Sequence, residues 1–198
     1  MVISFDDAAA FLPKYLAPES RKELFAEIRN FERIRYYARI DDPEPLQGDG
    51  WANSAFWDLE AAAERKMPVA VISNSCDIAG ENKGKRPGRI TISPIIRLAR
   101  VEALLEKYGA NKEQVIQYCK DIRAQEISDI FFLPQGGGVE EDSVIFLDNL
   151  QSPLLERFIG IAEARRRYSL SQAGFWLFLV KLAIHFCRAQ EDIKRGYA

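Results

Sequence analysis

The stretch PVAVI at 68–72, followed directly by SNSCDIAGENKG at 73–84, gives the first strong indication of the fold. Five apolar residues in a row, bounded by turn-forming residues, are typical of a strand that is buried in a sheet. The polar segment after it holds one cysteine and two acids. Loops that leave core strands are where rigid scaffolds present binding or catalytic residues. We therefore predict a buried strand with a functional rim at its end.

Short apolar runs on both sides of this strand predict further strands. They lie at 34–40, 54–60, 89–99, 129–134 and 143–150. Two helical runs, at 101–109 and 111–125, interrupt the series and form a helical insertion. Several short strands with few helices between them favour a small antiparallel sheet or barrel, in an α+β protein with helices at both ends.

The chain of 198 residues is long enough to bury a sizeable core, and we predict one domain. Its parts are N-terminal helices at 1–33, a barrel or sheet at 34–150 with the insertion at about 100–125, and a C-terminal segment at 151–198.

The C-terminal segment contains the longest apolar stretch, AGFWLFLVKLAIHFC at 173–187. It is shorter than the roughly 20 residues that a membrane span needs, and it contains Lys181 and His185. We therefore predict a buried core helix, capped at its start by Ser169 or Ser171, and no membrane partner.

The formal net charge of −2 gives no global electrostatic argument for a nucleic-acid or membrane partner. Basic residues do gather at 165–167 and between 83 and 89. The simpler interpretation is a solvated helix end and a flexible basic loop, and the alternative is a local basic groove.

The three cysteines, Cys76, Cys119 and Cys187, are an odd and widely spaced set, which fits a reducing compartment. The start of the chain lacks the basic region of a signal peptide. We therefore expect a cytoplasmic protein. The sequence has no glycine-rich phosphate motif, so no cofactor is predicted.

Four motifs follow one another in a recognisable order: QGDGW at 47–51, PVAVISN at 68–74, RITISPI at 89–95 and SVIFLDNLQSPLLERF at 143–158. Their order resembles the PemK/MazF toxin family. The resemblance implies an SH3-like barrel, RNA as a ligand, and a link to toxin–antitoxin or defence systems in bacteria.

The resemblance also implies where catalytic residues would lie. The family's catalytic arginine precedes the proline of the second strand, and here Met67 stands before Pro68. Its catalytic threonine lies two places after the proline of a later strand, and here Ile96 follows Pro94 at that spacing. Methionine and isoleucine cannot stabilise a phosphate during RNA cleavage. We therefore expect a binding module without the family's ribonuclease activity.

An enzyme is the second hypothesis. Cys76 would be the nucleophile of a hydrolase or nuclease, His185 its base, and Asp77 or Asp49 the group that orients the base. The alternatives are a small buried cysteine at a strand end and a hydrogen-bonded core histidine.

The candidate binding residues are Asp49, Asn74, Ser75 and Lys66, which surround the end of the predicted strand or precede it. Asp49 has the alternative role of a turn residue, and the polar residues after the strand have that of local caps. No acid, cysteine or histidine pair has the spacing of a metal motif, so no metal is predicted.

The predicted partners are RNA or another protein. A third hypothesis is a structural protein that forms a homodimer through the helical insertion and the apolar C-terminal helix.

Overall fold

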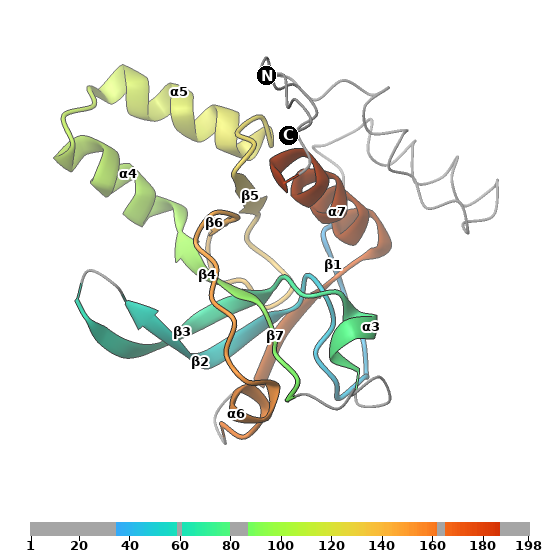
Figure 1. The fold of residues 1–198 in the computed structure, drawn as a ribbon. Coiled ribbons are helices and arrows are strands. Elements are labelled where there is room, and N and C mark those ends of the chain that lie inside the picture. Colours follow the sequence, from blue (N-terminus) through green and yellow to red (C-terminus); the bar gives the residue numbers. More distant parts are fainter. Residues whose placement is uncertain (1–34, 59–60, 80–86, 162–164, 187–198) are drawn as a thin grey trace, which may run out of the picture.

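The computed structural model describes residues 35–58, 61–79, 87–161 and 165–186. These residues form seven strands and five helices in an α+β arrangement (Figure 1). The predicted helices at 1–33 and Cys187 lie outside the described residues.

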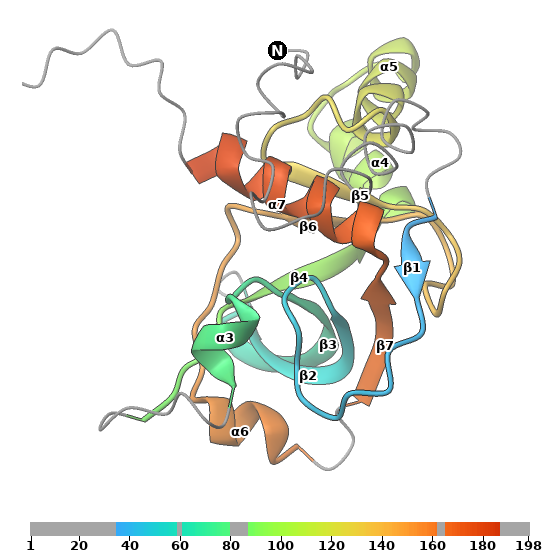
Figure 2. The ribbon, with the colours of Figure 1, turned by 90° about the vertical axis from the view of Figure 1, so that its right-hand side faces the viewer.

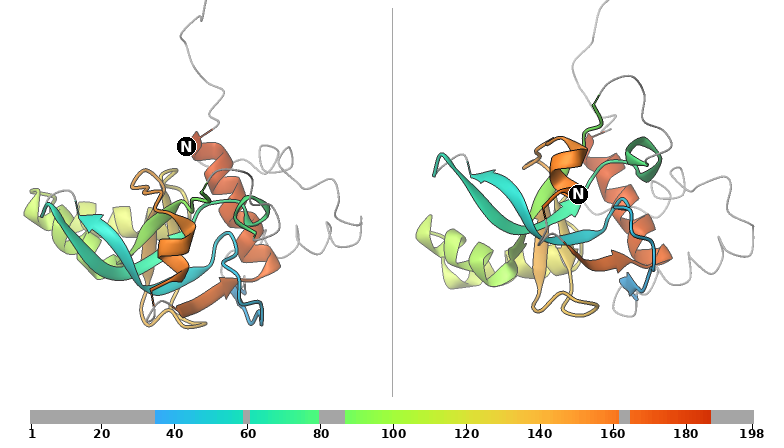
Figure 3. Two further views of the ribbon diagram at one scale, coloured as in Figure 1. Left: turned by 60° about the horizontal axis from the view of Figure 1, so that its bottom comes forward. Right: turned by 90° about the horizontal axis from the view of Figure 1, so that it is seen from below.

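One antiparallel sheet contains all seven strands, in the order β1-β7-β2-β3-β4-β6-β5. The strands are β1 (Tyr37–Ala38), β2 (Gly50–Asp58), β3 (Ala63–Val71), β4 (Ile92–Arg97), β5 (Ile130–Leu133), β6 (Ser143–Phe146) and β7 (Arg165–Leu170). Within the described residues β1 and β5 are the two edges and do not pair with each other, so the sheet is open. The sheet curls strongly, and the outer part of the β2–β3 pair extends away from its body (Figure 3).

The apolar run PVAVI at 68–72 does form a buried strand. Val69, Ala70 and Val71 of β3 are completely buried, between β2 on one edge and β4 on the other. Strands also occur at each of the other five predicted positions. Apolar runs bounded by turn residues were therefore sufficient to predict them.

Strand β7 contradicts one prediction from the sequence. The prediction of a solvated helix end at 165–167 is wrong, because Arg165–Leu170 pairs with β1 on one edge and with β2 on the other. Three consecutive arginines are unusual in an internal strand. They are accommodated here because Arg166 and Arg167 form ion pairs with carboxylates from distant parts of the chain.

The helical insertion consists of α4 (Leu98–Lys107) and α5 (Lys112–Arg123), and it joins β4 to β5. Asn111 and Gln114 form a capping box at the start of α5. The apolar faces of the two helices pack on β5 and β6, while the pair projects from the sheet (Figure 1). The predicted insertion at about 100–125 is thus confirmed.

Helix α7 (Gln172–Phe186) crosses one side of the sheet (Figure 2). Ser171 caps it, because Ser171 Oγ accepts a hydrogen bond of 3.1 Å from the backbone N–H of Gly174. Trp176 and Phe178 are fully buried, so the prediction of a core helix is confirmed. No helix of the described residues has both the length and the hydropathy needed to cross a bilayer.

A buried cation joins α7 to the insertion. The ammonium group of Lys181 is fully buried and donates hydrogen bonds to the backbone carbonyls of Gln125, at 2.9 Å, and of Ile127. These carbonyls follow the end of α5, where a positive charge also suits the helix dipole. Burial lowers the pKa of Lys181 to about 8.

The hairpin between β5 and β6 brings the two edges of the curled sheet together. The hydroxyl of Tyr37, in β1, donates a hydrogen bond of 2.6 Å to the carbonyl of Pro134, which follows β5. Gly138 has φ +105°, and a Cβ there would lie 2.1 Å from the carbonyl oxygen of Arg167. Glycine is therefore required for this close approach of the hairpin to β7.

The side chain of Gln151 contacts the outer part of β2, at Trp57. The backbone N–H of Trp57 donates to Gln151 Oε1 at 2.9 Å, and Gln151 Nε2 donates to the carbonyl of Trp57 at 2.5 Å. Gln151 lies shortly before the short helix α6 (Leu155–Ile159). Its amide thus makes the two bonds that a neighbouring strand would make.

Candidate functional site

Side chains of the polar segment after β3 form hydrogen bonds with nearby backbone groups. Asn74 caps the short helix α3 (Ser75–Ile78) by accepting a hydrogen bond of 2.9 Å from the backbone N–H of Cys76. Ser75 Oγ accepts another of 2.9 Å from the backbone N–H of Gln47. We call residues 73–78 the corner. Its predicted binding residues Asn74 and Ser75 hold the backbone in place.

Asp49, the third predicted binding residue, is buried in a turn. Its carboxylate lies 2.6 Å from Arg166 Nε and accepts a hydrogen bond of 3.1 Å from the backbone N–H of Leu46. Gly48 provides the φ of +87° that the turn needs. Burial raises the pKa of Asp49, although Arg166 acts in the opposite direction.

Arg166 explains why a charged pair is tolerated there. Its guanidinium also donates to the backbone carbonyls of Ile40, Asp42 and Glu44, and it lies 5.7 Å from the ring centroid of Trp51. The guanidinium therefore has several acceptors besides Asp49, as a buried ion pair requires. Asp49 and Arg166 together hold the segment before β2 against β7.

The candidate catalytic residues lie on two separate helices. Cys76 and Asp77 are exposed on α3, whereas His185 is half-buried near the end of α7 and packs against the ring of Phe186 at 4.6 Å. In the part of the chain that the structure describes, no three His, Cys, Asp or Glu side chains could hold a metal ion. The nucleophilic role of Cys76 stays a prediction.

A cavity of about 240 Å³ opens where β3 and β4 diverge. The two strands pair only between Val69 and Val71, and β4 then continues in pairs with β6. Met67 and Pro68 of β3 line one side of the cavity, and Ile96 of β4 lines the other. We call it the Met67 cavity. It contains the two positions at which the family resemblance implies catalytic residues.

Three arginines from three elements line the same cavity: Arg97 at the end of β4, Arg100 in α4 and Arg167 in β7. Arg97 pairs with Glu141 at 3.3 Å, and Arg167 pairs with Glu140 at 2.8 Å. Arg100 forms no ion pair with another described residue. The cavity therefore combines an apolar surface with guanidinium groups.

The ion pair of Arg97 can be exchanged at little cost, because Arg97 and Glu141 have side-chain exposures of 69% and 45%. Exposed pairs of this kind contribute about 0–1 kcal/mol to stability. In the other pair Arg167 is only 26% exposed, although its partner Glu140 is 84% exposed. An anionic ligand can therefore replace Glu141 as the partner of Arg97 more readily than Glu140 as the partner of Arg167.

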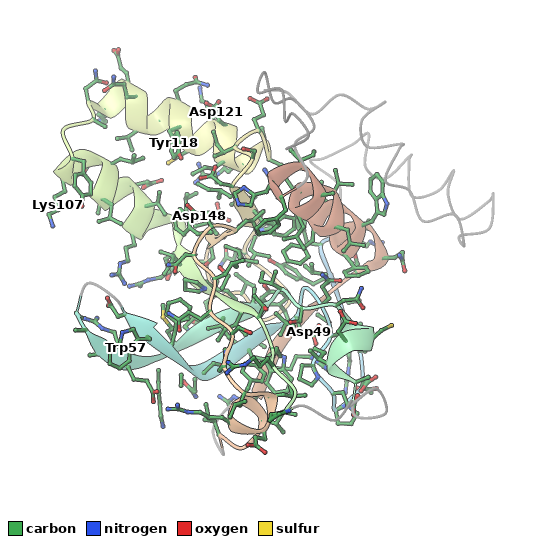
Figure 4. All side chains as sticks on the ribbon, viewed as in Figure 1. Asp49, Trp57, Lys107, Tyr118, Asp121 and Asp148 are labelled. Carbon is green, nitrogen blue, oxygen red and sulfur yellow. The ribbon has the colours of Figure 1, made fainter. Side chains whose placement is uncertain are left out.

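Lys66 is the one predicted binding residue that adjoins the Met67 cavity along the chain, since it precedes Met67 in β3 and is exposed. Asp49, Asn74 and Ser75 lie instead near Val71, where β3 ends. Figure 4 shows Asp49 beside α3 and Trp57 at the opposite end of the β2–β3 pair.

The sequence prediction missed the three arginines of the cavity. Arg97 and Arg100 stand three residues apart where a strand turns into a helix, a weak signal for a site. Arg167 belongs to the basic run at 165–167, for which a local basic groove was the alternative interpretation. Comparisons of the chain with models of protein families and with curated proteins give no match.

Proposed function

We propose that this protein binds single-stranded RNA in the Met67 cavity without cleaving it. The observation that carries the proposal is that Arg97, Arg100 and Arg167 line one cavity together with Met67 and Ile96. Guanidinium groups bind phosphates in a planar, two-pronged geometry. Apolar surface beside them accepts the faces of unstacked bases.

The proposal includes an SH3-like barrel as the fold. A strongly curled antiparallel sheet supports an SH3-like barrel related to that of the PemK/MazF toxins, although its edges do not pair in the described residues. A role in toxin–antitoxin or defence systems follows from the same resemblance. A cytoplasmic location agrees with an RNA ligand and with the odd number of cysteines.

The lining of the cavity favours binding over cleavage. RNA cleavage needs a group that removes a proton and groups that stabilise the charge on the phosphate. The three arginines of the cavity are groups of the second kind, but no histidine lines the cavity, since the single histidine of the chain, His185, belongs to α7. Met67 and Ile96 supply neither kind of group.

The test is titration of a fluorescein-labelled, unstructured oligouridine with the purified protein, followed by fluorescence anisotropy. Replacing Arg97 and Arg100 together by alanine should weaken binding roughly tenfold or more. It should also reduce the slope of log affinity against log salt by about 0.7 for each phosphate that the variant no longer neutralises. Arg157→Ala is the matched control, since Arg157 is 62% exposed and pairs with Glu64 on another part of the surface.

No binding by the wild type, or equal affinity of the double variant, would contradict the proposal. The same samples run on a denaturing gel should show intact RNA. Cleavage by the wild type that disappears in a Cys76→Ala, Asp77→Ala variant would replace the proposal with the enzyme hypothesis.

A further inference from the structure

The hairpin between β5 and β6 closes the Met67 cavity on the side of β7. Residues 139–141 of the hairpin line the cavity. Directly before them, the backbone of Gly138 packs on the backbone of Arg167, and the backbone of Gly137 packs on the side chain of Tyr37. A Cβ at these two glycines would lie 2.1 Å and 2.4 Å from those neighbours, so no ligand fits between them. A nucleic-acid strand in the cavity therefore cannot continue across β7.

The volume of the cavity also limits what it can hold. The cavity measures about 240 Å³, whereas pockets for drug-sized ligands typically measure roughly 300–1,000 Å³. This is room for a single nucleotide with its phosphate, and not for a run of nucleotides. A strand whose last nucleotide lies in the cavity satisfies both the volume and the closure by the hairpin.

Two guanidinium groups of the cavity are available to a ligand. Arg100 forms no ion pair with another described residue, and the pair between Arg97 and Glu141 is exposed. A phosphate that ends a strand carries about −1.5 to −2 charges at pH 7. A phosphate within a strand carries a single negative charge. Two available guanidinium groups therefore match a terminal phosphate better than an internal one.

The position of these two arginines is unfavourable for α4 itself. Arg97 is the N-cap residue, Arg100 lies in the first turn, and that turn contains no acidic residue. The partial positive charge at the start of a helix favours acids there and disfavours arginines. Local conflicts of this kind are expected where residues serve a function. A terminal phosphate in the cavity compensates the charge of both arginines.

We infer that the RNA enters the Met67 cavity by one end, and that Arg97 and Arg100 together bind the terminal phosphate of that end. This inference rests on the proposed function and deepens it, because it names the class of RNA: a strand with a phosphomonoester at its 5′ or 3′ end. The base of the terminal nucleotide lies against Met67 and Ile96. The two kinds of end present the same chemical group, and the experiment distinguishes them.

The experiment uses decauridines with fluorescein on an internal base, which carry a 5′ phosphate, a 3′ phosphate or no terminal phosphate. Fluorescence anisotropy gives their affinities for wild type, Arg100→Ala and Arg157→Ala. The wild type should bind at least one phosphorylated RNA roughly tenfold more tightly than the unphosphorylated RNA, as expected for one additional charge-assisted contact. Arg100→Ala should bind all the RNAs with similar, weakened affinity. Arg157→Ala should keep the affinities and the preference of the wild type.

The outcomes separate the inference from the proposed function. If the wild type binds all the RNAs equally while the Arg97, Arg100 double variant fails to bind, the terminal-phosphate site is wrong and the proposed function stands. A preference for phosphorylated RNA that persists in Arg100→Ala would also contradict the inference, because the phosphate would then bind elsewhere. If the wild type binds none of the RNAs, both the function and the terminal-phosphate site are wrong.

Discussion

The corner, which follows the end of β3, and the Met67 cavity, at the middle of the same strand, show how differently polar residues can be used. The corner is the more conspicuous in the sequence, yet the side chains of Asn74 and Ser75 are engaged with nearby backbone groups. The cavity is assembled from β3, β4, α4, β7 and the β5–β6 hairpin. Polar residues that follow one another satisfy the backbone first, whereas groups that converge from distant elements are available to a ligand.

The largest expected effect tests whether the surroundings of the corner are structural. Arg166→Leu leaves the carboxylate of Asp49 buried without its partner and removes the donor of three carbonyls. We expect the free energy of unfolding to fall by about 3–5 kcal/mol, measured by chemical denaturation. Arg165→Leu, at the exposed neighbouring position, is the control and should change it by less than about 0.5 kcal/mol. A small decrease with Arg166→Leu would mean that Asp49 is free for another role.

How much of the fold could be predicted depends on where each signal lies in the sequence. Local patterns predicted β3, the insertion and α7, because each element carries its own apolar period and caps. Strand β7 was missed, since its arginines are stabilised by Asp49 and Glu140, which are 117 and 27 residues away in the chain. No local pattern contains those partners.

A second prediction concerns Lys181, which stabilises the helical insertion that forms part of the wall of the Met67 cavity. The corner, in contrast, is stabilised by local hydrogen bonds. Lys181 secures the end of α5, and α5 packs on α4, which carries Arg100. Burial lowers the pKa of Lys181 from 10.5 to about 8, while Asp129 acts in the opposite direction. Between these values the unfolded chain holds more protons, so stability increases as the pH rises. From pH 8 to 9.5 we expect a gain of about 1–2 kcal/mol.

Denaturation of wild type and Lys181→Met over this pH range isolates the effect. The variant should lack the gain, whatever its absolute stability. Burial also raises the pKa of Cys119 to about 11 and the pKa values of Tyr37 and Tyr168, and ionisation of these groups in the unfolded chain favours unfolding as the pH rises. This loss is common to both proteins, so the contribution of Lys181 is the difference between their slopes. Equal slopes in both proteins would show that Lys181 is not the group responsible.

The smallest expected effects separate the corner from the cavity directly. Asn74→Ala removes the cap of α3 and should cost about 1 kcal/mol of unfolding free energy. Asp77→Ala, at an exposed position next to it, should cost less than about 0.5 kcal/mol. Neither should change RNA affinity, in contrast to the Arg97, Arg100 double variant. Weaker RNA binding by Asp77→Ala would make the corner a binding site after all.

The site was less predictable than the fold. The resemblance pointed to Met67 and Ile96, and both line the cavity. The charged groups of the cavity, however, are Arg97, Arg100 and Arg167. These residues lie together only because β3 diverges from β4 and because β7 pairs within the sheet. Those are properties of the assembled sheet.

The amide of Gln151 has a consequence for the protein in concentrated solution. An exposed strand edge is a template on which a second molecule can add its own strand, and growth of this kind leads to aggregates. Gln151 occupies both backbone groups of Trp57 at such an edge, next to an indole that is 48% exposed. Because this one side chain occupies the groups that a second strand would need at Trp57, we expect Gln151→Ala to lower the solubility of the protein without a change in its fold.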